Sequence, residues 1–155
     1  MIRPLSLAAL LLASTAAVAE NSKPQPVPYV DTIPAAKDVP YPGTITLAID
    51  ATDTRRAIFK VKEVVPVAKA GHMVLLFPKW LPGNHSPTGQ IEKLAGLKIS
   101  AGGKPVAWTR DPVDVFAFHV NVPAGAKALD IDLQFLSATA GNQGRVVMTP
   151  TMLSL

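Results

Sequence analysis

The chain has 155 residues, no cysteine and a formal net charge of +4. Its charges are scattered, and no basic stripe with stacking aromatic residues occurs, which argues against a nucleic-acid-binding protein. Without disulfides a hydrophobic core must stabilise the fold. Fifteen prolines, about twice the usual share of roughly 5%, argue against a helical bundle and favour short strands joined by stiff turns.

The first nineteen residues have the pattern of a secretory signal peptide. Arg3 supplies positive charge, residues 5–18 are apolar and small, and Ala17-Val18-Ala19 fits the small-x-small rule for cleavage. The apolar segment is short for a membrane span, so we expect cleavage near Glu20 rather than a membrane anchor. The sequence therefore predicts an exported protein, periplasmic or secreted, with no membrane contact after cleavage.

A proline-rich leader is expected over residues 20–42, which contain six prolines. Such a composition is typical of extended, partly polyproline-like chain. Apolar side chains such as Tyr29 and Tyr41 are available to anchor it on the domain surface. Disorder after signal cleavage is the alternative.

From residue 43 onward the hydrophobic pattern has the period of two that is typical of strands. Strands are expected over 44–50, 57–65, 72–77, 97–101, 106–108, 113–122 and 129–135, with another beginning at Val146. A tight hairpin turn is predicted at Gly102-Gly103, and one short helical turn at 91–95. The sequence thus predicts one all-β domain over 43–155, an antiparallel β-sandwich or saddle-like double sheet of about seven strands.

The segment 77–90 follows the most apolar strand and cannot itself be regular, because it contains three prolines and two glycines. Pro82-Gly83 is a favoured central pair of a tight turn. A rigid loop with exposed polar side chains is a candidate contact site, made of Trp80, Pro82, Gly83, Asn84 and His85. The simpler interpretation is a strand connection in which Trp80 plugs the core.

Both tryptophans, Trp80 and Trp108, are expected to weigh heavily in the core. A buried tryptophan removes about 150–250 Å² of surface from water, which is a large contribution for a domain of this size.

Catalytic machinery is not evident in the residues themselves. The three histidines, His72, His85 and His119, form no H-E-x-x-H helix, and no compact set of zinc ligands is visible. Ser86, His85 and Asp111 supply the residue types of a hydrolase triad, but no serine lies in a G-x-S-x-G elbow. We therefore expect no catalytic residue, metal or cofactor in this chain.

Two further polar patterns have simple interpretations. His119 lies on the less apolar face of its predicted strand, where a cross-strand polar pair is expected. Asp130 and Asp132 share one strand face. They are expected to be solvated carboxylates rather than an acid–base pair.

Three segments together resemble the N-terminal domain of the glycyl aminopeptidase family: Leu76–Pro87, Gly96–Ile99 and Gly103–Val106. These are exported zinc metallopeptidases that usually carry a PDZ domain. The shared motif is Trp-x-Pro-Gly at residues 80–83, and His85 stands where the family usually has an aromatic residue. The resemblance extends from Val39 to Leu155.

The resemblance implies a β-rich domain, similar to the saddle-like N-terminal domain of larger zinc aminopeptidases, beside a thermolysin-like catalytic domain. The zinc and its ligands would belong to polypeptide beyond Leu155, since the chain ends on apolar residues as if truncated within the domain. The expected partners are that catalytic domain and a peptide substrate, with Trp80, Pro82, Gly83 and His85 facing the cleft or the partner domain. Alternatives are an independent exported module that binds carbohydrate or protein, and a structural envelope protein.

Overall fold

The computed structural model describes residues 28–140, 142 and 144–155. The predicted signal peptide and the first part of the predicted leader lie outside these residues. Thr32–Leu155 form a compact unit of their own, and residues 28–31 belong to the other unit. In the part of the chain that is described, no helix has the length and apolar character needed to cross a bilayer.

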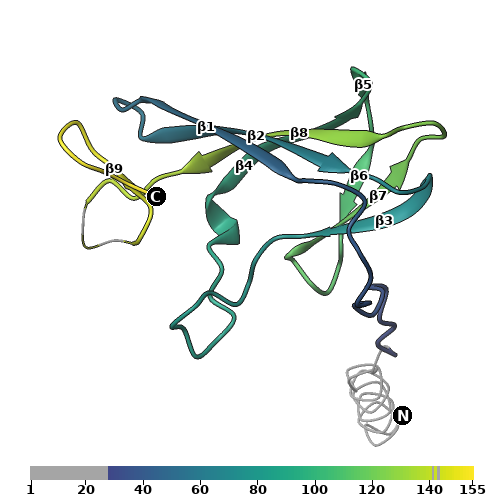
Figure 1. The fold of residues 1–155 in the computed structure, drawn as a ribbon. Helices are drawn as coiled ribbons and strands as arrows, with labels where there is room; N and C mark the ends of the chain where they lie inside the picture. The colour runs from purple at the N-terminus through teal and green to yellow at the C-terminus, as the bar shows by residue number, and fades with distance from the viewer. Residues whose placement is uncertain (1–27, 141, 143) are drawn as a thin grey trace, which may run out of the picture. The chain divides into compact units, whose positions relative to one another are not determined.

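Two antiparallel sheets form the main unit (Figure 1). The larger sheet has the order β1-β2-β8-β4-β5, from Thr46–Asp53, Ile58–Pro66, Ala128–Leu136, Leu94–Ala101 and Lys104–Pro105. The smaller sheet has the order β3-β7-β6, from Gly71–Leu76, Ala117–Val122 and Trp108–Arg110. A two-stranded ribbon, β9 (Val147–Met148) and β10 (Leu153–Ser154), ends the chain. The predicted all-β class and its double sheet are confirmed.

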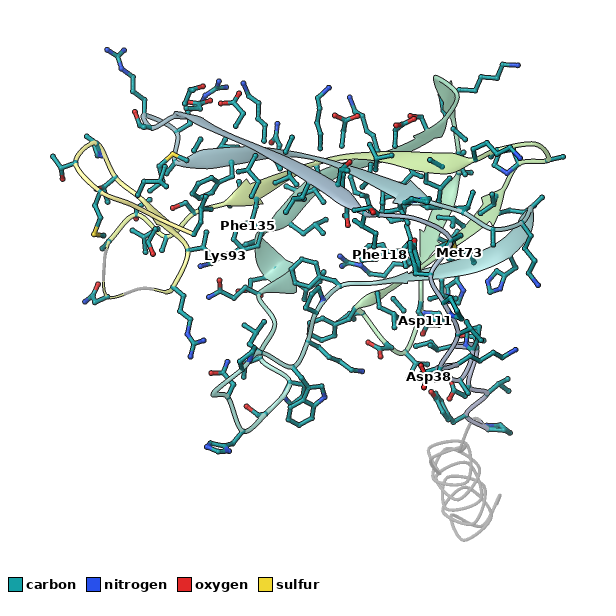
Figure 2. The ribbon with its side chains drawn as sticks, in the orientation of Figure 1. Asp38, Met73, Lys93, Asp111, Phe118 and Phe135 are labelled. Atoms are coloured by element: carbon teal, nitrogen blue, oxygen red, sulfur yellow. The ribbon has the colours of Figure 1, made fainter. Side chains whose placement is uncertain are left out.

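The main core lies between the two sheets. Strand alternation directs Val65, Leu129 and Ile131 of the larger sheet toward Val120 and Val122 of the smaller one, and all five are buried. Figure 2 shows Met73 and Phe118 in the same layer. Since β2 and β8 pair with unbroken register, every second side chain of each strand contributes to this one face.

A second, smaller core lies at the other end of the larger sheet. Phe59 of β2 and Met148 of β9 are almost fully buried there, and Phe135 packs against them. The Ser137 hydroxyl accepts a hydrogen bond from the Met148 amide at 2.5 Å, which ties the ribbon to the end of β8. The apolar face of the larger sheet is therefore covered at its two ends by different elements.

Neither tryptophan fills the core, contrary to the expectation. Trp80 is 60% exposed and Trp108 is 36% exposed. Trp108 lies on the edge strand β6, where its ring meets Phe118 edge to face and its Nε1 donates to the Leu97 carbonyl at 3.3 Å. The interpretation of Trp80 as a core plug is wrong.

Two predicted boundaries also shift. The strand expected from residue 113 begins only at Ala117, because the Asp111 and Asp114 carboxylates accept hydrogen bonds from the backbone amides of the preceding turn. The helical turn expected at 91–95 is a 3-10 turn, η1, over Ile91–Lys93, and Leu94 already begins β4. The hairpin turn at Gly102-Gly103 is confirmed, with φ values of 55° and 76°.

The described part of the predicted leader contains no helix or strand from residue 32 to residue 42. Two side chains attach it to the sheets. The Tyr41 hydroxyl donates to the Pro66 carbonyl at 2.9 Å, and the Thr32 hydroxyl donates to Asp111 Oδ2 at 2.5 Å. This segment therefore forms a surface strap without helix or strand.

We expect the Leu129→Ala substitution to lower the free energy of unfolding by about 2–5 kcal/mol, because a fully buried side chain would leave a cavity between the sheets. The matched Leu136→Ala change on the same strand, at an exposed position, should cost less than about 1 kcal/mol. Urea unfolding of both variants measures the difference. Equal losses would show that the core does not lie where we place it.

Candidate functional site

The loop 77–90 connects β3 to η1 and projects away from both sheets (Figure 1). Its base is closed by backbone hydrogen bonds from Phe77 to the Phe116 carbonyl at 2.8 Å and from Gly89 to the Lys79 carbonyl at 2.9 Å. Lys79 Nζ also forms a salt bridge with Asp114 Oδ2 at 2.5 Å. The hydrogen bond that Lys79 donates in this salt bridge holds the pKa of the Asp114 carboxyl below its ordinary value. The loop therefore starts and ends at one anchored point.

Pro82 and Gly83 form the predicted tight turn at the tip. The Asn84 amide donates to the Leu81 carbonyl at 3.0 Å, and Gly83 has a φ of 81°, which the third residue of a type II turn requires. Arg145, in the segment before β9, donates from Nη1 to the Pro82 carbonyl at 3.0 Å. The tip is thus braced from a segment far away in the sequence.

The five predicted contact residues have different environments. Asn84 is half-buried and stabilises the loop internally, since its Nδ2 donates a hydrogen bond to Thr88 Oγ1 at 2.7 Å. Trp80 and His85 are exposed, and no hydrogen bond or ion pair joins His85 to the other described residues. The loop consequently presents an indole and an imidazole on a backbone that is held by hydrogen bonds. Tryptophan side chains in such positions are common at protein interfaces.

A polar hollow of about 400 Å³ lies beside this loop, lined by Asn84, Thr88 and Gln90 together with Arg145. Next to it, Lys93 Nζ is buried and has no hydrogen-bond partner among the described residues. Figure 2 marks the position of Lys93. Buried cations without a partner favour an anionic group nearby.

A second polar cluster lies on the outer face of the smaller sheet, and the sequence predicts only one part of it, the cross-strand polar pair of His119. His119 Nε2 is 2.8 Å from Asp111 Oδ2, and His119 Nδ1 is 3.0 Å from His72 Nε2. Figure 2 shows Asp111 on the side of the smaller sheet that faces away from the larger one. The predicted cross-strand polar pair of His119 is confirmed. Asp111 bonds to His119 rather than to His85, with which the sequence had grouped it.

Strand register explains this cluster. The β3–β7 pairing places Asn121 opposite His72, and His119 lies two residues away on the same face of β7. Asp111 directly follows β6, whose Thr109 pairs with His119. Strand alternation alone could have assigned each histidine to a face, but the register that makes them neighbours is a tertiary property.

The Asp111 carboxylate is buried and fully used as an acceptor. The Thr32 hydroxyl, the backbone amides of Asp114 and Val113, and His119 all hydrogen-bond to it. These hydrogen bonds, the one from Thr32 foremost, hold the pKa of Asp111 far below its ordinary range. The carboxylate is therefore a permanent negative charge at neutral pH.

The described residues offer no set of ligands that fits the catalytic zinc implied by the family resemblance. Among the described residues, no three or more histidine, aspartate or glutamate side chains are grouped so that they could hold a metal ion. The sequence also contains no H-E-x-x-H. No step of zinc-dependent hydrolysis is therefore assigned to this chain.

We expect the Gly89→Ala substitution to open the base of the loop. An added Cβ would lie 2.0 Å from the Pro78 carbonyl oxygen and 2.7 Å from the Lys79 Cα, so the backbone would have to move. The free energy of unfolding should fall by about 2 kcal/mol or more, and Trp80 fluorescence should become easier to quench with iodide. The control is Gly125→Ala, where only φ strain arises because no atom lies within 4 Å. A loss no greater than that of the control would contradict a tightly closed loop.

We expect the stability contributed by Asp111 to be present above about pH 4, near the ordinary carboxyl pKa, and to be lost as the pH falls through the lowered folded value. Thr32→Val removes the largest cause of the lowering, so the Asp111 pKa should rise. NMR titration of the side-chain carboxyl carbon measures it. Thr44→Val, with the same change of side chain, should leave the Asp111 pKa where it is; an unchanged value in Thr32→Val would refute the assignment.

The sequence model of the Peptidase M61 N-terminal domain matches residues 46–155. Among solved structures, the crystal structure of an aminopeptidase N family protein from Idiomarina loihiensis is similar to this chain, with a TM-score of 0.55 and 13% sequence identity. The match covers 68% of this chain and 17% of that protein, and at this identity it shows a shared fold. No curated protein sequence matches the chain. From the family match over most of its length, the chain belongs to the Peptidase M61 N-terminal domain family.

Proposed function

We propose that this domain is the non-catalytic N-terminal part of an exported zinc metallo-aminopeptidase of the glycyl aminopeptidase type. It would form one wall of the substrate cleft beside a catalytic domain of the same polypeptide and restrict access to peptide N-termini. Zinc in that catalytic domain, a PDZ domain and a periplasmic or secreted location belong to the same proposal. The observation that carries it is the braced loop with its exposed Trp80, in a domain of the Peptidase M61 N-terminal family.

An uncovered apolar groove supports contact with a further domain. The groove, of about 440 Å³, lies over the middle of the larger sheet, between the two covered ends of its apolar face. Leu47 and Ile49 of the edge strand β1 are 59% and 41% exposed there, and Leu76 at the end of β3 is also exposed. Contiguous exposed apolar side chains beside an unpaired strand edge are typical of protein contact sites.

A carboxylate in this groove adds chemical selectivity. Glu63 of β2 lines the groove and pairs across the strands with Leu47 and Ile131, both apolar. Desolvation in these surroundings raises the pKa of Glu63. A basic side chain of the neighbouring domain would relieve this cost, so the groove favours an apolar partner surface that carries a positive charge.

In this proposal the loop and the groove bind the peptide or the neighbouring domain and take no part in cleaving the peptide bond. Trp80 and His85 are exposed on the loop. The indole offers a large contact area, and the imidazole offers a hydrogen-bond donor and an acceptor. Such groups position a peptide without changing the reacting bond. Their effect on catalysis is expected in substrate binding rather than in turnover.

The test uses the full-length polypeptide. We expect Trp80→Ala to raise the KM for peptide substrates by about threefold or more with kcat little changed, because uniform binding is lost. The matched control is Lys104→Ala at the start of β5, an exposed position that should behave as wild type. Unchanged KM in Trp80→Ala, or zinc-dependent release of N-terminal residues by residues 20–155 alone, would contradict the proposal. Reading the coding sequence beyond Leu155 for an H-E-x-x-H is the inexpensive first step.

An independent exported binding module is the second candidate, favoured by the polar hollow beside Lys93. Such a module must fold without a neighbour, so residues 20–155 should melt in one sharp transition. A domain that needs its neighbour should instead aggregate or unfold without cooperativity, since its apolar groove remains in water. Differential scanning calorimetry separates the two candidates.

A further inference from the structure

We propose that His72 and His119 form a binding site for a divalent transition metal ion, with Cu²⁺ preferred. The site lies on the outer face of the smaller sheet. The two nitrogen atoms that face each other, His72 Nε2 and His119 Nδ1, are 3.0 Å apart. Imidazole nitrogen is a ligand that suits copper, nickel and zinc.

Asp111 prepares one of these ligands. Its carboxylate lies 2.8 Å from His119 Nε2, which keeps the proton of the neutral ring on that nitrogen and leaves a lone pair on Nδ1. A carboxylate behind a ligating histidine is the usual arrangement in metal sites, where it orients the ring and raises its basicity. Because Asp111 is itself buried and held by Thr32 and two backbone amides, the orientation of His119 is well determined.

His72 supplies the second ligand. Because His119 Nδ1 carries a lone pair, the hydrogen bond between the two rings requires His72 to donate its Nε2 proton in the metal-free protein. When the metal enters, this proton moves to His72 Nδ1, so the neutral ring changes tautomer and no proton need be released. His72 is exposed on the edge strand β3 and can tilt its ring toward the ion, whereas His119 is held in place by Asp111.

The ligand types favour one ion. Two imidazole nitrogens with water in the remaining positions suit the tetragonal geometry of Cu²⁺, whereas structural Zn²⁺ sites use four protein ligands. The general affinity order of these ions also places Cu²⁺ first.

Space for the remaining ligands is available. A hollow of about 310 Å³ is lined by both histidines and by Thr109 and Asn121 of the neighbouring strands. Since only two side chains coordinate, water would complete the coordination, and the ion would stay accessible to solvent or to a small ligand. This site is separate from the braced loop and does not depend on the proposed peptidase role.

The experiment titrates tag-free, metal-free protein with Cu²⁺ by calorimetry and records the EPR spectrum of the complex. We expect one equivalent to bind, with hyperfine splitting from two imidazole nitrogens. His72→Ala should weaken binding by at least tenfold and remove one nitrogen from the spectrum. His72 is exposed, so this variant should unfold at the same urea concentration as wild type. Zn²⁺ should bind more weakly than Cu²⁺ throughout.

The third histidine provides the matched control. His85→Ala, on the exposed loop, should bind Cu²⁺ as wild type does. Asp111→Asn should weaken binding by about 10–100-fold while both nitrogens remain in the spectrum, because Asp111 acts through His119. Absence of binding by the wild type, wild-type affinity in His72→Ala, or loss of binding in His85→Ala would each overturn the proposal.

Discussion

Burial of one face of the β2–β8 pair is the constraint on which the rest of this domain depends. The two strands run antiparallel over their whole length, so their alternating side chains form one stripe that is apolar except for Glu63. The smaller sheet covers one end of that stripe around Leu129, and the β9–β10 ribbon covers the other around Phe59. The loop 77–90, which carries the first candidate site, runs from the smaller sheet to the larger one.

The braced loop is a consequence of this arrangement. The chain leaves the smaller sheet after β3 and must return to the larger sheet at β4, and the loop spans that passage. Prolines and the Pro82-Gly83 turn limit its conformations, while Lys79 and Gly89 close its base. The same passage leaves the middle of the apolar stripe uncovered, so the exposed indole of Trp80 and the apolar groove arise from one topological feature. Both support the proposal that the domain contacts a neighbouring domain.

The outer face of the smaller sheet has a different character. Its inner face is apolar and belongs to the core, whereas its outer face carries the Asp111–His119–His72 line. The strap that contains Thr32 reaches this line and completes the hydrogen bonding of Asp111. A segment without helix or strand thus takes part in ordering the most polar cluster of the domain, which links the surface strap to the chemistry of the two histidines.

The sequence by itself determined the all-β class, the hairpin at Gly102-Gly103 and the turn at Pro82-Gly83, because these follow from side-chain alternation and from backbone preferences within a few residues. The resemblance to a peptidase N-terminal domain is confirmed at the level of the Peptidase M61 N-terminal domain family. Only the tertiary structure decided that Trp80 and Trp108 stay at the surface, and that His72, His119 and Asp111 meet. Burial depends on which sheet covers which face, and a cross-strand neighbour depends on register, so both are set by packing between segments distant in the chain.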